Sequence, residues 1–188
     1  MTNLPDEIRE LVDRCLAGEQ AAMAALVDHF AGQVFGLCYR MLGNRQDAED
    51  VAQETFVRVF RSLTQFDRDR DFRPWLLAIA GNRCRSWLTS RRRVPLPTDL
   101  VDDLEDGSAE VQGIRALTEE VDLALVGLRE EYRTAFLLFH QHELSYAEIS
   151  ATLDCPVGTV KTWIHRARQE LARQLRARGV VEESQHEV

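Results

Sequence analysis

The amino-acid sequence predicts an all-α protein made of two small helical domains joined by a flexible acidic linker. Apolar residues recur at helical spacing along most of the chain, and no run of alternating β-branched residues indicates a strand. Pro95 and Pro97 interrupt the helical pattern, and the net charge changes sign on either side of this break. A length of 188 residues suits one large domain or two small ones.

The first domain, residues 1–95, is expected to contain four helices. Each has an apolar stripe at helical spacing, and they cover about residues 7–17, 19–42, 45–63 and 72–92. Gly18 and the Gly43-Asn44 pair end the first two helices, since such residues are typical of helix C-caps. Pro74 falls in the first turn of the fourth helix, where a missing amide hydrogen costs little.

An acidic segment separates this domain from the second. Residues 99–131 contain eleven acidic residues against two arginines. We expect residues 96–113 to form the linker and residues 114–178 to form a second helical domain. Residues 179–188 then form a short acidic tail.

The second domain contains the most specific pattern in the chain, two helices joined by a tight turn within residues 144–171. Ser145 and Glu148 have the spacing of a capping box, which begins the first helix, and Pro156 ends it. The second helix has an apolar stripe made of Val160, Ile164, Ala167 and Leu171. Its opposite stripe has the chemistry of a major-groove reader and consists of Thr162, His165, Arg166 and Gln169. This pattern indicates DNA as a ligand.

The overall net charge of −8 argues against nucleic acid, but the basic residues are clustered. Residues 72–98 contain six arginines and no acid, and residues 156–178 contain Lys161 and five arginines against Glu170, a net charge of +5. Both clusters fall on helical patterns. We therefore expect two DNA contacts separated by a linker that repels DNA, although solvated helix faces would produce similar clusters.

Two further groups of residues are ambiguous from the pattern alone. The third helix has an outward polar stripe, either solvated surface or a protein-binding site, made of Asp47, Asp50, Gln53 and Glu54. On the fourth helix, Asn82 is followed by Arg83 and Arg85, a placement that suits single-stranded DNA or phosphates. Trp75 on the same helix favours packing over base stacking.

Three segments together resemble the extracytoplasmic-function group of bacterial RNA polymerase sigma factors. They are LGNRQDAEDVAQETFVRVFRSL (Leu42 to Leu63), FRPWLLAIAGNRCRSWL (Phe72 to Leu88) and LSYAEISATLDCPVGTVKTWIHRARQEL (Leu144 to Leu171), in the family's order and spacing. The resemblance implies two helical domains, a region 2 bundle and a region 4 helix-turn-helix. It also implies a protein that binds core RNA polymerase, directs it to the −35 and −10 promoter elements and initiates transcription.

The resemblance also assigns roles to residues. In the family, the third helix docks on the clamp helices of the largest polymerase subunit, which makes core-binding candidates of Asp47, Asp50, Gln53, Glu54 and Phe56. The loop at residues 66–73 resembles the −10 reading loop, and Asn82 matches an asparagine that holds a flipped −10 base. The expected −10 set is Asn82, Arg83, Arg85, Arg73 and Arg91, in which the arginines suit phosphates.

The −35 contact positions of the family fall on the second helix of the helix-turn-helix. They correspond to Thr159, Lys161, Thr162, His165 and Arg166. Arg166 is the best candidate for a bidentate guanine contact, worth roughly 1–3 kcal/mol of discrimination. Thr159 and Lys161 suit phosphates. Trp163 stands where a basic residue is common, and packing is favoured over contact with a thymine methyl group.

Further partners follow from the same resemblance. A separate anti-sigma protein is the family's usual regulator, although no motif identifies it. We expect a cytoplasmic protein that such a partner could hold at the membrane, since no apolar run approaches the roughly 20 residues of a membrane span. The acidic linker is either a spacer or a mimic of nucleic acid near the polymerase channels.

Two other classes of function compete with this interpretation. A stand-alone helix-turn-helix regulator would use the first domain for dimerisation or sensing, but it leaves the outward polar stripe without a role. An enzyme is not expected, because no metal-ligand cluster, nucleophile constellation or phosphate-binding glycine loop is present, so we expect no catalytic residue, metal or cofactor. The four cysteines lie far apart in the sequence, at Cys15, Cys38, Cys84 and Cys155. This spacing favours free thiols in a reducing compartment.

Overall fold

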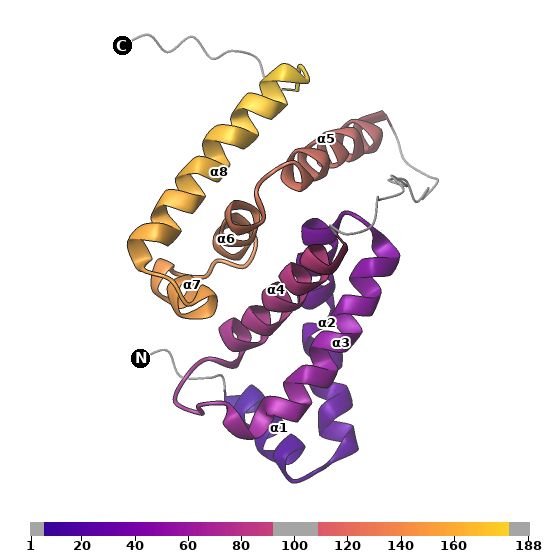
Figure 1. Cartoon of the computed structure of the whole chain (residues 1–188). Helices are drawn as coiled ribbons and strands as arrows, with labels where there is room; N and C mark the ends of the chain where they lie inside the picture. Colours follow the sequence, from indigo (N-terminus) through magenta and orange to yellow (C-terminus); the bar gives the residue numbers. More distant parts are fainter. Residues whose placement is uncertain (1–5, 92–108, 181–188) are drawn as a thin grey trace.

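The computed structural model describes residues 6–91 and 109–180, and the side chains of all of these except residues 109–116. The described residues are helical and contain no strand, which confirms the predicted all-α class (Figure 1). The helices are α1 (Asp6–Leu16), α2 (Gln20–Leu42), α3 (Arg45–Ser62), α4 (Phe72–Arg91), α5 (Ala109–Val126), α6 (Glu130–His140), α7 (Tyr146–Leu153) and α8 (Val157–Ala177), with a 3-10 turn, η1 (Leu63–Gln65), after α3.

Helix α2 is the centre of the first domain and packs against α1, α3 and α4. Its buried residues recur every three or four positions, at Ala22, Leu26, Phe30, Val34, Leu37 and Met41. An aromatic cluster closes one end of this core, with Phe66 and Phe72 ring centroids 5.4 Å apart and Phe66 and Trp75 centroids 5.0 Å apart. Trp75 therefore packs against the core, as the sequence predicts.

The connection between α2 and α3 follows from two local signals. Gly43 adopts the left-handed conformation, with φ of 71°, and its amide donates to the Tyr39 carbonyl oxygen at 2.8 Å. Asn44 then caps α3, because its Oδ1 accepts from the Asp47 amide at 3.0 Å. This tight turn sets α3 back against α2, where the two helices form the most extensive contact in the described structure.

The helix-turn-helix forms as predicted. The Ser145 amide donates to Glu148 Oε2 at 2.7 Å and the Glu148 amide donates to Ser145 Oγ at 3.2 Å, which completes the capping box of α7. Asp154 ends α7 in the left-handed conformation, with φ of 49°. Helix α8 follows Pro156, and the expected apolar stripe is buried at Val160, Ile164, Ala167 and Leu171.

Helix α5 differs from the sequence expectation. It begins at Ala109, so residues 109–113, expected in the linker, are helical. The linker pattern of acids and glycine gave no sign of this helix start. Residues 92–108 lie outside the described residues, and so does the expected role of the acidic linker. Residues 181–188 of the expected tail also lie outside them.

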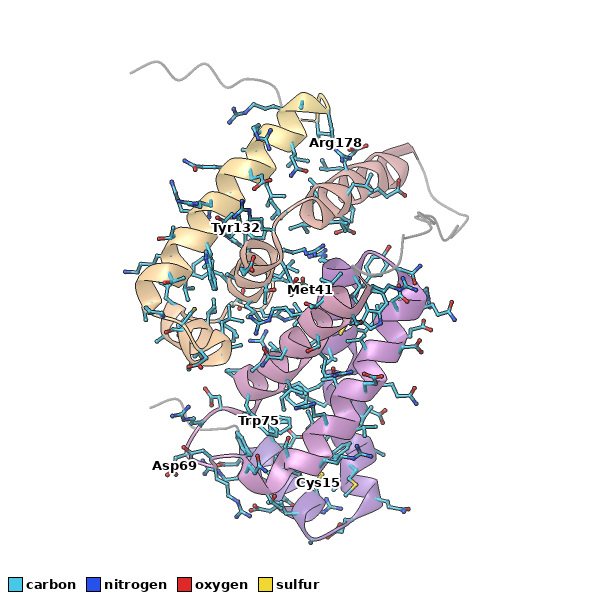
Figure 2. The ribbon with its side chains drawn as sticks, in the orientation of Figure 1. Cys15, Met41, Asp69, Trp75, Tyr132 and Arg178 are labelled. Carbon is cyan, nitrogen blue, oxygen red and sulfur yellow. The ribbon has the colours of Figure 1, made fainter. Side chains whose placement is uncertain are left out.

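The two domains pack against each other in this structure. Helix α4 contacts α6 and α7, and α2 contacts α5 and α6. Met41, on the side of the first domain that faces the second (Figure 2), accepts a hydrogen bond at Sδ from Thr134 Oγ1 at 3.4 Å. We call this contact the interdomain seam. Helical periodicity could not indicate this contact, because its residues belong to different domains.

Length and composition alone would let α2 cross a membrane, since its mean hydropathy is 1.3. This differs from the expectation that no apolar run approaches the length of a membrane span. In this structure the helix carries Asp28, His29 and Arg40, and its apolar residues pack against α1, α3 and α4. A core position accounts for the same composition.

We expect Ser145→Ala to lower the free energy of unfolding by about 1 kcal/mol, because one amide at the start of α7 loses its acceptor. Chemical denaturation followed by circular dichroism measures this change. Ser145→Thr keeps the acceptor and should lose much less. Equal losses in the two variants would show that the capping hydroxyl is not the cause.

Candidate functional site

The predicted reading face of α8 is exposed. Lys161, Thr162, His165 and Arg166 are all exposed on the side opposite the buried stripe, and Thr159 is half-buried in the first turn. Arg166, on the predicted groove face, has a partner inside its own domain, since its Nη1 donates a hydrogen bond to Tyr132 Oη of α6 at 3.2 Å. The Lys161 ammonium lies 5.6 Å from the centroid of the Tyr146 ring. Trp163 is half-buried against the core, which confirms the packing interpretation.

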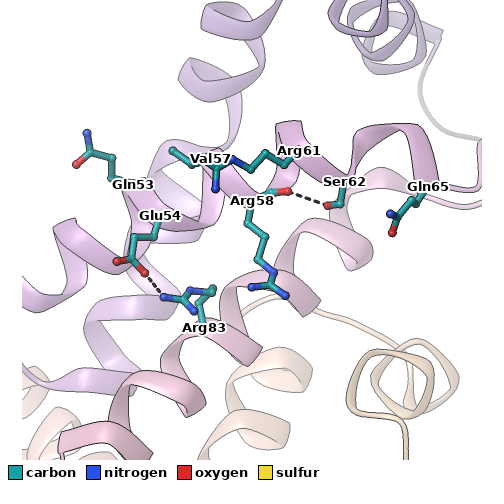
Figure 3. Close-up of a pocket in the computed structure, with 8 residues that line it drawn as sticks. All are labelled: Gln53, Glu54, Val57, Arg58, Arg61, Ser62, Gln65 and Arg83. Carbon is teal, nitrogen blue, oxygen red and sulfur yellow. Dashed lines mark hydrogen bonds and ion pairs between the residues drawn. The ribbon is translucent and has the colours of Figure 1, made fainter.

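The outward stripe of α3 borders a cleft. Asp50, Gln53 and Glu54 are exposed, and Val57 continues the same side with 45% of its surface exposed. Figure 3 shows the cleft of about 670 Å³ between α3 and α4, with Glu54 and Arg83 pointing toward each other. The lining residues are Gln53, Glu54, Val57, Arg58, Arg61, Ser62, Gln65 and Arg83. Sequence reasoning missed Val57 and Arg58, although an apolar side chain on a polar stripe is a usable signal.

Two of the core-binding candidates on α3 are buried and do not lie on this stripe. Asp47 is buried, so its expected place on the outward stripe is wrong. Its carboxylate, in the first turn of α3, forms an ion pair with Arg91 at 2.8 Å. Burial raises the pKa of Asp47, and Arg91 partly offsets this effect. Phe56 is also buried, in the core of the first domain, and offers little surface to a partner.

The expected −10 residues lie on or beside α4, and their arginines already have partners. Asn82 is exposed, and its Oδ1 accepts a hydrogen bond from Arg85. Arg83 pairs with Glu54 of α3. Arg91 pairs with Asp47 and lies over the Trp87 ring, 4.4 Å from its centroid.

Arg73 is the expected −10 residue that reaches the second domain. Its Nε donates to Gln33 Oε1 at 2.7 Å, and its Nη1 donates to the His142 carbonyl oxygen at 2.6 Å. His142 is 2% exposed, and no described residue pairs with its Nε2. Burial, together with the positive charges of Arg73 and Arg40, lowers the pKa of His142 to about 4. His142 is therefore neutral at pH 7.

The described residues present surfaces that differ in charge. Among them, no group of His, Cys, Asp and Glu side chains could hold a metal ion. What the structure brings together is an exposed cationic helix, an asparagine beside two arginines, and an acidic-amide stripe. The first two have the chemistry that suits nucleic acid, and the third has the chemistry that suits a protein partner.

Comparisons with known families match both domains. The Sigma-70 region 2 family matches residues 26–94, and the Sigma-70 region 4 family matches residues 118–171. The first match contains α3 and α4, and the second contains the helix-turn-helix. Two such regions in this order define a transcription initiation factor of the sigma-70 type.

Individual relatives identify the group within that class. The ECF RNA polymerase sigma factor SigW of Bacillus subtilis (strain 168) is 36% identical, over 90% of this chain and 97% of SigW. The RNA polymerase sigma-H factor of Pseudomonas aeruginosa is 33% identical, over 90% of this chain and 94% of that protein. The chain belongs to the ECF RNA polymerase sigma factors.

Solved structures agree with this assignment. CnrH in complex with the cytosolic domain of CnrY is 29% identical, with a TM-score of 0.67 over 90% of this chain and 97% of CnrH. RpoE in complex with the anti-sigma factor NepR from Bartonella quintana has the same fold, with a TM-score of 0.68 at 21% identity, over 81% of this chain and 96% of RpoE.

The buried His142 makes stability depend on pH. The unfolded histidine binds a proton below about pH 6.5, whereas the folded one does so only near pH 4, so stability falls as the pH drops through this window. Between pH 7 and pH 4.5, we expect wild type to lose about 2–3 kcal/mol more unfolding free energy than His142→Gln. Denaturant titrations at both pH values measure the difference.

The control for this measurement is His165→Gln, which changes an exposed histidine on α8. It should follow wild type at both pH values. A wild-type profile that matches that of His142→Gln would contradict the buried, neutral state of His142.

Proposed function

We propose that this sigma factor binds core RNA polymerase through the exposed stripe of α3 and directs it to promoters through α4 and α8. The observation that carries the proposal is the presence, on one chain, of an exposed acidic-amide stripe on α3 and two separate cationic helices, in the order of the family. The domains that divide this work are residues 1–95 and 114–178, joined by the linker. A stand-alone helix-turn-helix regulator would leave the α3 stripe and its cleft without a role.

The α3 surface that supports core binding is smaller than the sequence assignment. It consists of Asp50, Gln53 and Glu54 with Val57 beside them, since Asp47 and Phe56 are buried. Acids and an amide around an exposed apolar side chain match the usual anatomy of a protein interface, in which a small apolar centre is ringed by polar groups. The partner surface is expected on the clamp helices of the largest polymerase subunit.

For −35 recognition, α8 supplies the reading helix. Residues near the N-terminal end of a recognition helix contact base edges, and Thr162, His165 and Arg166 are exposed there. A guanidinium that binds O6 and N7 of guanine would give roughly 1–3 kcal/mol of discrimination. Thr159 and Lys161 lie at the beginning of α8, before Thr162, and they suit phosphates.

For −10 recognition, Asn82 is the residue proposed to hold an unstacked base. Extruding a base costs a few kcal/mol, which a pocket must offset with stacking and hydrogen bonds to the base edge. Asn82 offers an amide for that edge, and Arg83 and Arg85 offer charge to the adjacent phosphates. Arg91 and Arg73 complete the set only when they leave their internal partners.

An anti-sigma protein is the proposed regulator, and the cytoplasm is the proposed location. The support comes from relatives, because RpoE of Bartonella quintana was solved in complex with the anti-sigma factor NepR. Such a partner could hold the protein at the membrane. We further propose that the protein acts by binding and has no catalytic activity of its own.

The α3 stripe can be tested by reversing its charge. Asp50→Lys combined with Glu54→Lys should weaken binding to core RNA polymerase at least about tenfold, because like charges across an interface cost several kcal/mol. Size-exclusion co-elution and a fluorescence titration with bacterial core enzyme measure the change.

The matched control for this test is Glu7→Lys with Glu10→Lys, which makes the same charge change on the exposed side of α1. It should bind as wild type does. Normal affinity of the Asp50 and Glu54 variant would make the stripe solvated surface, and equal loss in both variants would make the effect one of net charge.

Wild type should transcribe about 10- to 100-fold more from a promoter with the −35 guanine than from one in which that guanine is replaced. Arg166→Ala should abolish this discrimination and leave core binding intact. Transcription from matched and mutated −35 elements by reconstituted holoenzyme measures it. Arg173→Ala removes the same charge two turns further along α8 and should keep the discrimination. Loss of core binding in Arg166→Ala would count against the assignment.

A further inference from the structure

We propose that the cleft between α3 and α4 is a binding site for a small ligand with two or more linked phosphate groups, such as a nucleoside polyphosphate. Three arginines that share this cleft are the main contacts. Binding is a property of the isolated chain. The effect of the ligand on polymerase, which we also infer, rests on the proposed function.

The cleft has the shape and size of a small-molecule site. Its residues from α3 and η1 fall at the spacing of one helix face, from Glu54 to Gln65, and Arg83 of α4 lies opposite them. Its volume of about 670 Å³ lies within the range of about 300–1,000 Å³ that is usual for such sites. A nucleotide fits a site of this size.

The charges in the cleft favour an anion. Figure 3 shows Arg58 and Arg83 pointing into the space between α3 and α4, with Glu54 beside Arg83. Arg58 and Arg61 are exposed, and neither forms an ion pair with any side chain that the structure describes. Three positive charges therefore stand against one negative charge, a net charge of +2 among the lining residues. An anion with more than one charge neutralises this excess.

The arginine that has a partner can exchange it. Arg83 forms its ion pair with Glu54, and the side chains are 27% and 56% exposed. Ion pairs that are this open to water are weak. A phosphate group offers two oxygens to a planar guanidinium and carries more charge than a carboxylate, so it replaces Glu54 as the partner of Arg83.

The edge of the cleft suits the remainder of a nucleotide. Gln53 and Gln65 are exposed, and their amides can both donate to and accept from the edge of a base. Val57, with 45% of its surface exposed, offers an apolar contact to the face of a ring. Charged groups for phosphates and neutral groups for a base thus line one cleft.

The cleft is distinct from the residues proposed to hold DNA. Asn82 and Arg85 are joined by a hydrogen bond, and neither lines the cleft. Arg83 is the one residue that the cleft shares with the expected −10 set. A DNA strand that binds at Asn82 therefore need not enter the cleft, which leaves the cleft to a smaller ligand.

The position of the cleft links the small ligand to polymerase. Gln53 and Glu54 belong both to the cleft and to the exposed stripe of α3 proposed to bind core polymerase. A ligand that contacts them covers part of that stripe, so the ligand and polymerase compete. Because such coupling is reciprocal, each lowers the affinity for the other by the same factor.

The site can be tested by calorimetric titration of the whole chain with GTP and, separately, with inorganic tripolyphosphate, in a low-salt buffer without magnesium. Wild type should bind both probes. Arg58→Gln combined with Arg61→Gln should weaken binding at least about tenfold, because a hydrogen bond to a charged group is worth about a factor of ten or more. Tighter binding of GTP would show that the nucleoside is recognised, and equal binding would assign the site to the phosphates alone.

The matched control is Arg45→Gln with Arg176→Gln, which removes the same two charges from exposed positions outside the cleft. It should bind the probes as wild type does. Glu54→Gln should bind them about two- to fivefold more tightly, because it removes a competitor of the strength of an exposed ion pair. This variant keeps the test valid even if the protein without Arg58 and Arg61 does not fold.

The competition is measured by fluorescence titration with bacterial core RNA polymerase. Saturating GTP should lower the affinity of wild type for core polymerase at least about fivefold. It should have no effect on Arg58→Gln with Arg61→Gln, which controls for GTP bound to the polymerase itself. An unchanged affinity of wild type would overturn the competition.

The binding site is overturned if wild type binds neither probe. Equal losses in the cleft variant and in its control would also overturn it, because the effect would then be one of net charge. If Arg58→Gln with Arg61→Gln loses affinity for randomised single-stranded DNA as much as for GTP, the cleft belongs to a DNA strand. Failure of the proposed function would look different, since GTP binding would persist while no form of the protein would co-elute with core polymerase.

Discussion

Helix α4 is packed on two sides, and the rest of the structure depends on that constraint. Its buried residues Leu76, Leu77 and Cys84 complete the core of the first domain, where each leucine contributes roughly 1.5–3 kcal/mol. On another side it meets α6 and α7 of the second domain. Only a narrow strip of this helix remains for a ligand, and Asn82 lies in it. Core packing, domain arrangement and DNA contact therefore compete for the surface of one helix.

The arginines of α4 are held by hydrogen bonds and ion pairs within the protein. Each has an internal partner that is a carboxylate, an amide or a carbonyl, and most of these pairs are partly exposed, so each is worth about 0–1 kcal/mol. Such weak bonds hold the side chains in place without committing them, because a phosphate oxygen can replace the partner at little loss. Because the net charge of the chain is −8, the proposed affinity for DNA would have to come from these local clusters and would fall with salt.

The sequence predicted features that depend on neighbours in the chain and missed those that depend on the assembled fold. The capping box of Ser145, the C-cap at Gly43 and the buried stripe of α8 each follow from local spacing, and all were found. Asp47 was misplaced because its partner, Arg91, is far away in sequence, and helical periodicity alone cannot show which polar residue will be covered. The seam was missed for the same reason, since Met41 and Thr134 lie in different domains and far apart in the sequence. The start of α5 was missed because acidic, glycine-containing sequence resembles a linker.

Under the proposed function, the hydrogen bond from Arg166 to Tyr132 would affect how the protein selects DNA. An unrestrained arginine loses up to about 2 kcal/mol of rotamer freedom when a base edge immobilises it. The Tyr132 phenol of α6 already restricts part of that freedom, so Arg166 would meet the groove in a narrower range of orientations. A side chain oriented in advance would disfavour base edges that are out of line with it. The fidelity of reading at this position would then depend partly on α6, a helix that need not touch the DNA.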